Sequence, residues 1–479
     1  MRLTLRGAGG KQTWPSRECG TTEAPINIPG PVLMMRTTLA RAPSLPESSP
    51  IQKVSSISSK QTSAGAGSAS AVSRPCPTAR RCRGGPRRPR ATRAGTAFAS
   101  AVSSGRSPSD AVSLPLIDGP CVWRGPELRA APELWTHRLT ASEIAELDAA
   151  LARARAANLD VIDLTPETFP LPSLAPRLRA LRDELVLGRG VYLFRGLPVR
   201  RWDRWETCAA FYALGAHMGW TCPQNARGHV LGHVKDLGND PTDPATRLYT
   251  TAAAQPFHTD SADIVGLLCV ENAREGGESQ VVSTAAVYNA LASERPEMAA
   301  ALLEPFPVDR KGETPPGKKP TYAMPIFHLH PSSAFSSKRD DENPSQSQSY
   351  ALSGIYDRSF VDAAQKRWSA ADGVPRLTRA QIDALDALDA TCADDEFRLD
   401  MRLEPGDAQW LHNHTTFHAR SAYERGSDRH LLRVWVAPEN ARPLPEAFAE
   451  RFGELEPGPN RGGVRVEGQT PYCALEPGG

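Results

Sequence analysis

The sequence lacks any apolar run long enough to cross a membrane. Its longest apolar stretch, Ile264 to Val270, includes Gly266 and falls far short of the ~20 residues that a spanning helix needs. This excludes a transmembrane protein. Cysteine is sparse as well: the nine cysteines form no CxxC pair, and their number is odd. A disulfide framework or a zinc ribbon would need regular pairs. Several cysteines lie in apolar runs, which indicates buried thiols in a reducing, intracellular compartment.

The chain also lacks a strong net charge, because 56 basic and 54 acidic residues give +2. The two signs are unevenly distributed. Residues 1–109 carry 17 basic and three acidic residues, so the remaining sequence is acidic. A nucleic-acid binder would instead show a basic stripe on its folded face. We therefore expect a small-molecule ligand, with neither a nucleic acid nor a membrane as partner. The sequence does not indicate an oligomeric state.

Residues 1–111 are rich in Arg, Ser and Pro and contain almost no aromatic residue after Trp14. Such a segment cannot bury enough apolar surface to offset its chain entropy, so we predict that it is disordered. Arg- and Ser-rich, acid-poor N-termini are typical of organelle transit peptides, and both a cytoplasmic and a mitochondrial location stay open. A gene start at Met34 or Met35 is the alternative interpretation.

Order is expected from residue 112, with one domain over 112–450. A Ser/Asp/Gln-rich insertion (331–349) interrupts it, and a Gly/Pro-rich flexible tail (451–479) follows. Thr140 and Glu143 form a capping box that opens a helix, and further helices are predicted at 203–218 and from residue 378. Buried strands are predicted at 191–194, 264–270, 279–282, 397–403, 407–411 and 431–436. Many short strands without a βαβ rhythm predict a mainly β, antiparallel core with flanking helices, an α+β fold.

One short motif has the chemistry of a metal site. His258 and Asp260 precede a buried strand, and residues i and i+2 of an extended chain project from the same face. An imidazole, a nearby carboxylate and a distant histidine make the facial triad of non-haem Fe(II) oxygenases. This composition gives about one His-x-Asp/Glu by chance, so the pair alone carries little weight.

Three more motifs accompany the pair: Gly276-Gly277-Glu278-Ser279, the run from Asn413 to Arg420, and the run from Arg429 to Trp435. In the order and spacing of these four elements the sequence resembles the taurine dioxygenase/TfdA-like family of Fe(II)- and 2-oxoglutarate-dependent dioxygenases, over roughly residues 120–450. The resemblance implies a double-stranded β-helix, or jelly-roll, core. It also implies Fe(II) as the metal and 2-oxoglutarate and O2 as cosubstrates.

By the same resemblance, His258, Asp260 and His418 hold the iron. His412 and His414 are alternatives for the third ligand, but an arginine follows His418 at the family's spacing.

That arginine, Arg429, is implied to bind the distal carboxylate of 2-oxoglutarate, because a guanidinium pairs with a carboxylate through two parallel hydrogen bonds. Ser279 is implied to support the same carboxylate. Arg433 matches a position that contacts an anionic substrate in some members, or it braces the cosubstrate site.

Other polar residues are weaker candidates. Gln224, Asn225 and Tyr249 match positions that line the substrate pocket, with ordinary structural hydrogen bonding as the alternative. A surface or structural role is expected for Asp263, and a structural role for the pairs His229/His233 and His328/His330.

The expected function is a dioxygenase that hydroxylates or desaturates a small, anionic organic substrate and releases succinate and CO2. Asp260 argues against a halogenase, which leaves that ligand site vacant for halide. A metal-dependent hydrolase with the same ligands and a catalytically silent jelly-roll binding protein are the alternatives.

Overall fold

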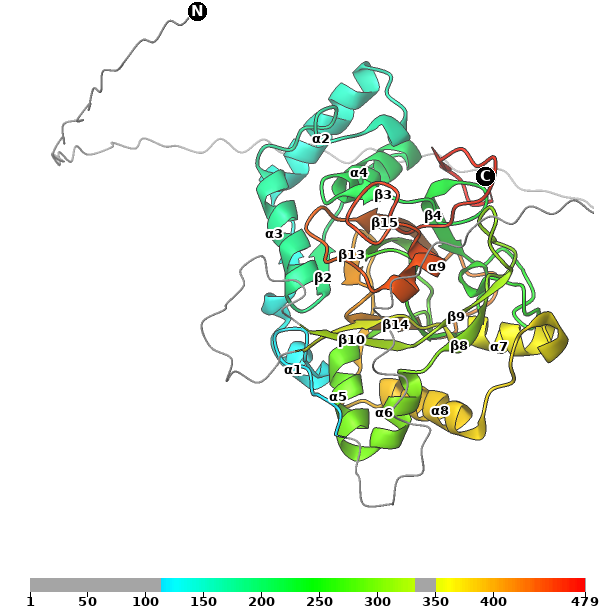
Figure 1. Ribbon diagram of the computed structural model, residues 1–479. Helices are drawn as coiled ribbons and strands as arrows, with labels where there is room; N and C mark the ends of the chain where they lie inside the picture. Colours follow the sequence, from blue (N-terminus) through cyan, green and yellow to red (C-terminus); the bar gives the residue numbers. More distant parts are fainter. Residues whose placement is uncertain (1–112, 332–349, 479) are drawn as a thin grey trace, which may run out of the picture. The chain divides into compact units, whose positions relative to one another are not determined.

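The computed structural model describes residues 113–331 and 350–478, drawn in Figure 1. The predicted segment 1–111 and nearly all of the predicted insertion 331–349 lie outside the described residues. The described part mixes helices with many short strands, which confirms the α+β prediction. Within it, no helix is both long and apolar enough to cross a membrane, and its six cysteines are free.

The larger sheet has eight strands and is mainly antiparallel; its two parallel pairs, β1–β2 and β16–β4, lie at its two edges. Its order is β1-β2-β13-β6-β15-β4-β16, with β3 beside β15. The strands are β1 (Thr136–Arg138), β2 (Val191–Arg195), β13 (Ala408–His412), β6 (Ile264–Glu271), β15 (His430–Ala437), β4 (His229–Lys235), β16 (Tyr472–Cys473) and β3 (Trp220–Thr221).

The smaller sheet has four antiparallel strands in the order β12-β7-β14-β5. They are β12 (Leu399–Met401), β7 (Ser279–Ser283), β14 (Thr416–Arg420) and β5 (Gln255–His258). Two hairpins complete the strands: β8 (Phe306–Asp309) with β9 (Thr321–Met324), and β10 (Phe327–Pro331) with β11 (Tyr350–Gly354).

The two main sheets share one apolar core. Val265 and Trp435 of the larger sheet belong to the same buried cluster as Val281 and Met401 of the smaller one. Because side chains alternate along a strand, the neighbouring residue Val282 faces the other way and packs into a different cluster. Each sheet therefore has one face toward the other sheet and one face toward helices.

Helices cover these outer faces (Figure 1). Helices α2 (Ala141–Ala156), α3 (Leu174–Leu187) and α4 (Arg204–Ala216) pack on the larger sheet, while α5 (Thr284–Glu294), α6 (Pro296–Leu302) and α8 (Arg379–Ala393) pack on the smaller one. The other α-helices of the described residues are α1 (Gly125–Ala130), α7 (Arg358–Arg367) and α9 (Ala449–Phe452).

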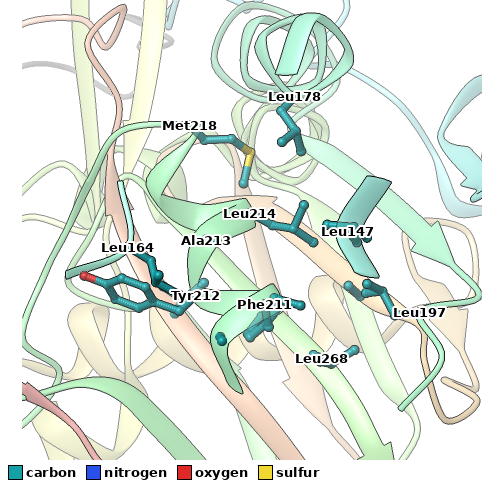
Figure 2. Close-up of a cluster of buried hydrophobic side chains, with 14 of the residues drawn as sticks. Leu147, Leu164, Leu178, Leu197, Phe211, Tyr212, Ala213, Leu214, Met218 and Leu268 are labelled. Carbon is teal, nitrogen blue, oxygen red and sulfur yellow. The ribbon is translucent and has the colours of Figure 1, made fainter. Parts of the chain in front are cut away.

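The cluster beneath α4 anchors the larger sheet (Figure 2). Phe211 lies 5.4 Å, centroid to centroid, from the ring of Trp410 on β13. Leu214 and Leu268 are fully buried in the same cluster, and burying each such side chain contributes about 1.5–3 kcal/mol. At the start of α2, the predicted capping box is present: Glu143 N–H donates to Thr140 Oγ1, and Thr140 N–H donates to the Glu143 carboxylate.

The C-terminal segment differs from the flexible tail expected over 451–479. Strand β16 pairs with β4, and Arg461 is 1% exposed, with its Nη2 2.5 Å from Asp263 Oδ1. Backbone hydrogen bonds such as Gly463 N–H to Ser261 O, the buried side chain of Val464 and the short strand β16 also hold this segment. These contacts are scattered and form no apolar period along the chain, so the Gly/Pro-rich composition alone suggested a flexible tail.

Candidate metal centre

Three buried side chains converge between the two sheets. Their ligand atoms, from His258, Asp260 and His418, all lie within 4.8 Å of one another. The backbone register brings them together, since His418 on β14 is the direct cross-strand partner of His258 on β5. His418 also pairs with Val281, which faces the core between the sheets. The arrangement of these three side chains thus depends on strand pairing across a sequence separation of 160 residues.

The donor set suits a divalent metal ion. The two imidazole rings are 4.2 Å apart, and His418 Nε2 lies 3.8 Å from Asp260 Oδ2. Burial lowers the pKa of His418 to about 3, so this imidazole is neutral at pH 7. Burial raises the pKa of Asp260, but Arg433 and then His418 outweigh it and lower that pKa to about 2. Asp260 Oδ2 is buried without a hydrogen-bond partner among the described residues. A neutral imidazole and an ionised carboxylate are the forms that bind metal.

Asn413 fixes the backbone that carries Asp260. Its side-chain Oδ1 accepts from Asp260 N–H at 3.0 Å, and its Nδ2 donates to Ala262 O at 2.8 Å. Its own N–H donates to Asp263 O at 2.8 Å. Three hydrogen bonds from one residue therefore join the loop after β13 to the loop after β5.

A second group of potential ligand atoms comprises Asp263, His412 and His414. Asp263 Oδ1 is 3.1 Å from His414 Nε2 and is also paired with Arg461. The guanidinium thus already supplies the positive charge that a metal would bring. His412 and His414, the alternatives for the third ligand, lie in this group and not beside His258. Asp263 is fully buried, which leaves the structural role of the two expected for it.

A cavity adjoins His258, Asp260 and His418 and is also lined by Arg429 and Ser279. Arg429 is 2% exposed, and its Nη2 donates to Gly277 O at 3.0 Å. Its Nε and Nη1 have no hydrogen-bond partner among the described residues. A buried guanidinium with two open N–H donors matches a planar carboxylate.

Sequence reasoning missed two buried residues of this cavity, Arg420 and Gln409. Arg420 Nη2 donates to Thr251 O at 3.1 Å and also contacts Ala253 O, while its Nε and Nη1 have no partner among the described residues. Burial lowers the pKa of Arg420 to about 10, so it stays charged at pH 7. A signal existed for Arg420, because it follows His418 by two residues on one strand and so shares its face.

Arg433 contacts the metal-site carboxylate directly. Its Nη1 donates to Asp260 Oδ1 at 3.1 Å, and its Nε donates to Gln224 Oε1 at 2.7 Å. Its guanidinium lies 4.8 Å from the ring centres of both Tyr249 and Trp435. Arg433 therefore leaves only one Asp260 oxygen, Oδ2, without a protein partner.

The three residues predicted to bind substrate differ in their contacts and in the cavities that they border. Gln224 Nε2 donates to the carbonyls of Val230 and Arg433, so its amide is engaged within the protein. Asn225 Oδ1 accepts from the N–H groups of a turn, and both residues border a neighbouring cavity. Tyr249 borders this neighbouring cavity, the cavity lined by Arg429, and a further cavity that His258 and Asp260 also border.

The remaining histidine pairs take part in structural contacts. His229 and His233 lie on strand β4, and His233 Nδ1 is 2.8 Å from His430 Nε2. His328 on β10 has its Nε2 3.1 Å from Pro325 O. In the described parts of the chain, neither pair belongs to a group that could hold a metal.

Comparison with known proteins identifies a family match over much of this region. Residues 158–435 match the model of the "Taurine catabolism dioxygenase TauD, TfdA family". FR-33289 synthase of Streptomyces rubellomurinus is 31% identical over 349 residues, which cover 70% of this chain and 95% of that protein. A taurine hydroxylase-like protein of Stachybotrys chartarum is 28% identical, covering 66% of this chain and 79% of its own length.

Two further proteins are similar to the chain. Uridine-5'-phosphate dioxygenase of an Amycolatopsis species is 29% identical over 211 residues, covering 42% of this chain and 67% of that protein. Among solved structures, asparagine oxygenase in complex with Fe(II), hydroxyasparagine and succinate has a TM-score of 0.46 and 16% identity, covering 63% of this chain and 93% of the other.

Proposed function

The chain belongs to the TauD/TfdA family of 2-oxoglutarate-dependent iron dioxygenases, and from this we propose that it hydroxylates, or desaturates, a small anionic organic substrate with release of succinate and CO2. One observation carries the proposal. Two imidazoles and a carboxylate meet beside a cavity whose wall contains a buried arginine with two open N–H donors. We assign the two facing sheets around this site to a double-stranded β-helix.

In this proposal, His258, Asp260 and His418 hold Fe(II). When bound, the iron supplies, together with 2-oxoglutarate and O2, the oxidant that removes a hydrogen atom from the substrate. The protein's contribution is positioning. The Arg433 guanidinium takes one oxygen of Asp260 and leaves Oδ2 for the metal. Asn413 holds the peptide of Asp260 in place.

Arg429 is the residue proposed to bind the distal carboxylate of 2-oxoglutarate. Its unpartnered Nε and Nη1 give the two parallel donors that such a carboxylate accepts. Ser279 borders the same cavity and carries a hydroxyl that can donate to the same carboxylate. A hydrolase with the same three ligands would have no use for these two open donors, which favours the dioxygenase.

The substrate is proposed to occupy a second, larger cavity, which is bordered by His258 and Asp260. Met324, Ile326 and Ile355 give it an apolar wall, and Arg247 and Lys311 add positive charge. Two of the similar proteins are named for uridine 5'-phosphate and taurine, which carry a phosphate and a sulfonate. An anionic substrate fits both the charge of this cavity and those names.

The test is an anaerobic titration of Fe(II) and then 2-oxoglutarate into the full chain. A keto acid chelated to Fe(II) gives a weak visible charge-transfer band, which we expect to form here. The band should be lost in His258→Ala and kept in the matched control His217→Ala, which removes a histidine that hydrogen-bonds to Phe169 O and borders neither cavity next to the candidate metal centre. A folded, iron-loaded protein without the band would contradict the dioxygenase and favour the hydrolase or the silent binding protein.

A further inference from the structure

Three cationic side chains surround one aromatic ring in the larger cavity. The guanidinium carbons of Arg247 and Arg451 lie 5.3 and 5.2 Å from the ring centre of Phe360, and Lys311 Nζ lies 4.7 Å from it. We call Arg247, Lys311 and Arg451 the cationic collar. Its members come from three separate segments: the loop after β4, the loop between β8 and β9, and helix α9. All three border the cavity that His258 and Asp260 also border.

The collar carries more positive charge than its surroundings neutralise. Arg247 is paired with the carboxylate of Glu313. Lys311 Nζ donates only to neutral acceptors, Thr246 O at 3.2 Å and Ser359 Oγ at 3.0 Å. Arg451 has no carboxylate within ion-pair distance among the described residues, and its guanidinium lies over the Phe360 ring. Two cations of the collar thus lack an acidic partner in the part of the chain that the structure describes.

The acidic groups around the collar are engaged elsewhere. Asp357 accepts from the N–H and the hydroxyl of Ser359 and caps helix α7. Asp309 is paired with Arg367, and Glu450 with Arg310. Burial lowers the pKa of Lys311; Asp357 and Asp309 raise it, while Arg247 and Arg367 lower it further. Holding an incompletely neutralised cation in a half-buried position costs free energy that a bound anion would offset.

The backbone of Lys311 gives a second, independent indication. Its φ is +49°, a left-handed conformation that only one other non-glycine residue of the described chain, Asn158, adopts. Such a conformation costs of order 1–3 kcal/mol and is concentrated at binding and active sites. Lys311 N–H donates to Asp309 Oδ1 at 2.7 Å, which helps hold the strained residue in place. Lys311 therefore borders the cavity from a backbone conformation that costs free energy.

We propose that the cationic collar is the subsite for a dianionic phosphorus oxyanion of the substrate, as in a phosphate monoester or a phosphonate. This assignment rests on the proposed function. Two cations without acidic partners match two negative charges, and donors from three segments match an oxyanion with oxygens in several directions. A carboxylate would need only one guanidinium. The apolar residues that line the same cavity then receive the carbon chain that is oxidised.

The experiment is isothermal titration of the full chain with four probes of similar size: phenyl phosphate, phenylphosphonate, benzenesulfonate and benzoate. The phosphorus probes should bind at least tenfold more tightly at pH 8 than the two monoanions. The affinity of phenyl phosphate should fall as the pH drops below about 6, where a phosphate monoester takes up its second proton. The affinity of phenylphosphonate, a weaker acid, should begin to fall at a higher pH. Tighter binding of phenyl phosphate identifies a phosphate ester and tighter binding of phenylphosphonate a phosphonate; either result supports the assignment.

Variants of the collar residues test whether the phosphorus probes bind at the collar. Lys311→Met and Arg451→Gln should each weaken phosphorus-probe binding by about 10- to 100-fold, the effect of losing a charged hydrogen-bond partner. The matched control Lys319→Met removes an exposed lysine of the same loop and should have no effect. Equal binding of all four probes, or unchanged binding in both collar variants, would overturn the assignment.

The charge-transfer band with 2-oxoglutarate is measured separately in the same proteins. If the band is absent while phosphorus probes still bind at the collar, the proposed function fails and the anion subsite stands. If the band forms and the collar shows no preference, the subsite fails and the dioxygenase stands.

Discussion

Replacing Arg429 by glutamine should remove most of the affinity for 2-oxoglutarate while leaving iron binding intact. The guanidinium is 2% exposed, makes one hydrogen bond to Gly277 O, and keeps Nε and Nη1 open toward the cavity. Losing one partner of a buried charge pair costs about 3–5 kcal/mol, because the other charge is left without compensation. At about 1.4 kcal/mol per factor of ten, the dissociation constant should rise by roughly 150- to 5,000-fold.

The assay is the anaerobic 2-oxoglutarate titration, followed by the charge-transfer band at a fixed Fe(II) concentration. Arg402→Gln is the matched control, because Arg402 contacts the carbonyls of Ala273 and Arg274 near the same turn and borders neither cavity next to the metal centre. Its titration curve should superimpose on that of the unchanged protein.

A second arginine, Arg420, is the alternative partner for the 2-oxoglutarate carboxylate and allows the assignment of Arg429 to be tested. Arg420 borders the same cavity, and its guanidinium, like that of Arg429, lies about 5 Å from the ring of Tyr423. Arg420 is also tied to two backbone carbonyls, so we expect Arg420→Gln to weaken binding less than Arg429→Gln does. If Arg420→Gln abolishes the band and Arg429→Gln leaves it unchanged, the assignment of the carboxylate partner is wrong.

Three further predictions follow from buried contacts. In Gly277→Ala, the added Cβ would lie 2.5 Å from Arg429 Nε, at a φ of +74°, so 2-oxoglutarate affinity should fall at least tenfold with Fe(II) affinity kept, as seen by titrating each. Burial raises the pKa of Glu143, but hydrogen bonds from Thr140 and His137 lower it to about 2 from 4.5. A carboxyl group whose pKa is lower in the folded state stabilises the folded protein at pH values above its unfolded-state pKa. Glu143→Gln should therefore lower the free energy of unfolding by about 2 kcal/mol at pH 7. Urea unfolding at a series of pH values should show this difference vanish as the pH falls from about 5 to 2. Asp263→Asn leaves the buried Arg461 without a carboxylate and should destabilise by about 3–5 kcal/mol in thermal unfolding, whereas Asn in place of the exposed Asp428 should not.

Local sequence patterns correctly predicted helices and strands that depend on interactions between residues close together in the chain. The Thr140/Glu143 box begins α2 as expected, and the apolar run from Ile264 is strand β6. The order and spacing of four motifs also predicted the family, which the comparisons confirm. The structure brings His418 to His258 and Asp260 as the resemblance implied. The metal and cosubstrate roles of these residues stay predictions that the titrations test.

Long-range polar contacts could not be predicted in the same way. Arg461 meets Asp263 across 198 residues, and no apolar period or turn signal marks either residue. The cationic collar likewise combines three segments whose charges look like ordinary solvent-exposed residues in the sequence. Such clusters arise from the path of the chain between the sheets, so they become visible only once the strand pairing is known.

The register between β5 and β14 also has a consequence for how the protein acquires its metal during synthesis. A ribosome that has just added Asp260 has made two of the three proposed iron ligands, and His418 follows 158 residues later. At about 5–20 residues per second, this takes roughly 8–32 s. For that interval the nascent chain carries an incomplete chelate, so iron should enter only after β14 has paired with β5. Metal uptake would then be a late step of maturation, and a convenient reporter that the smaller sheet has closed.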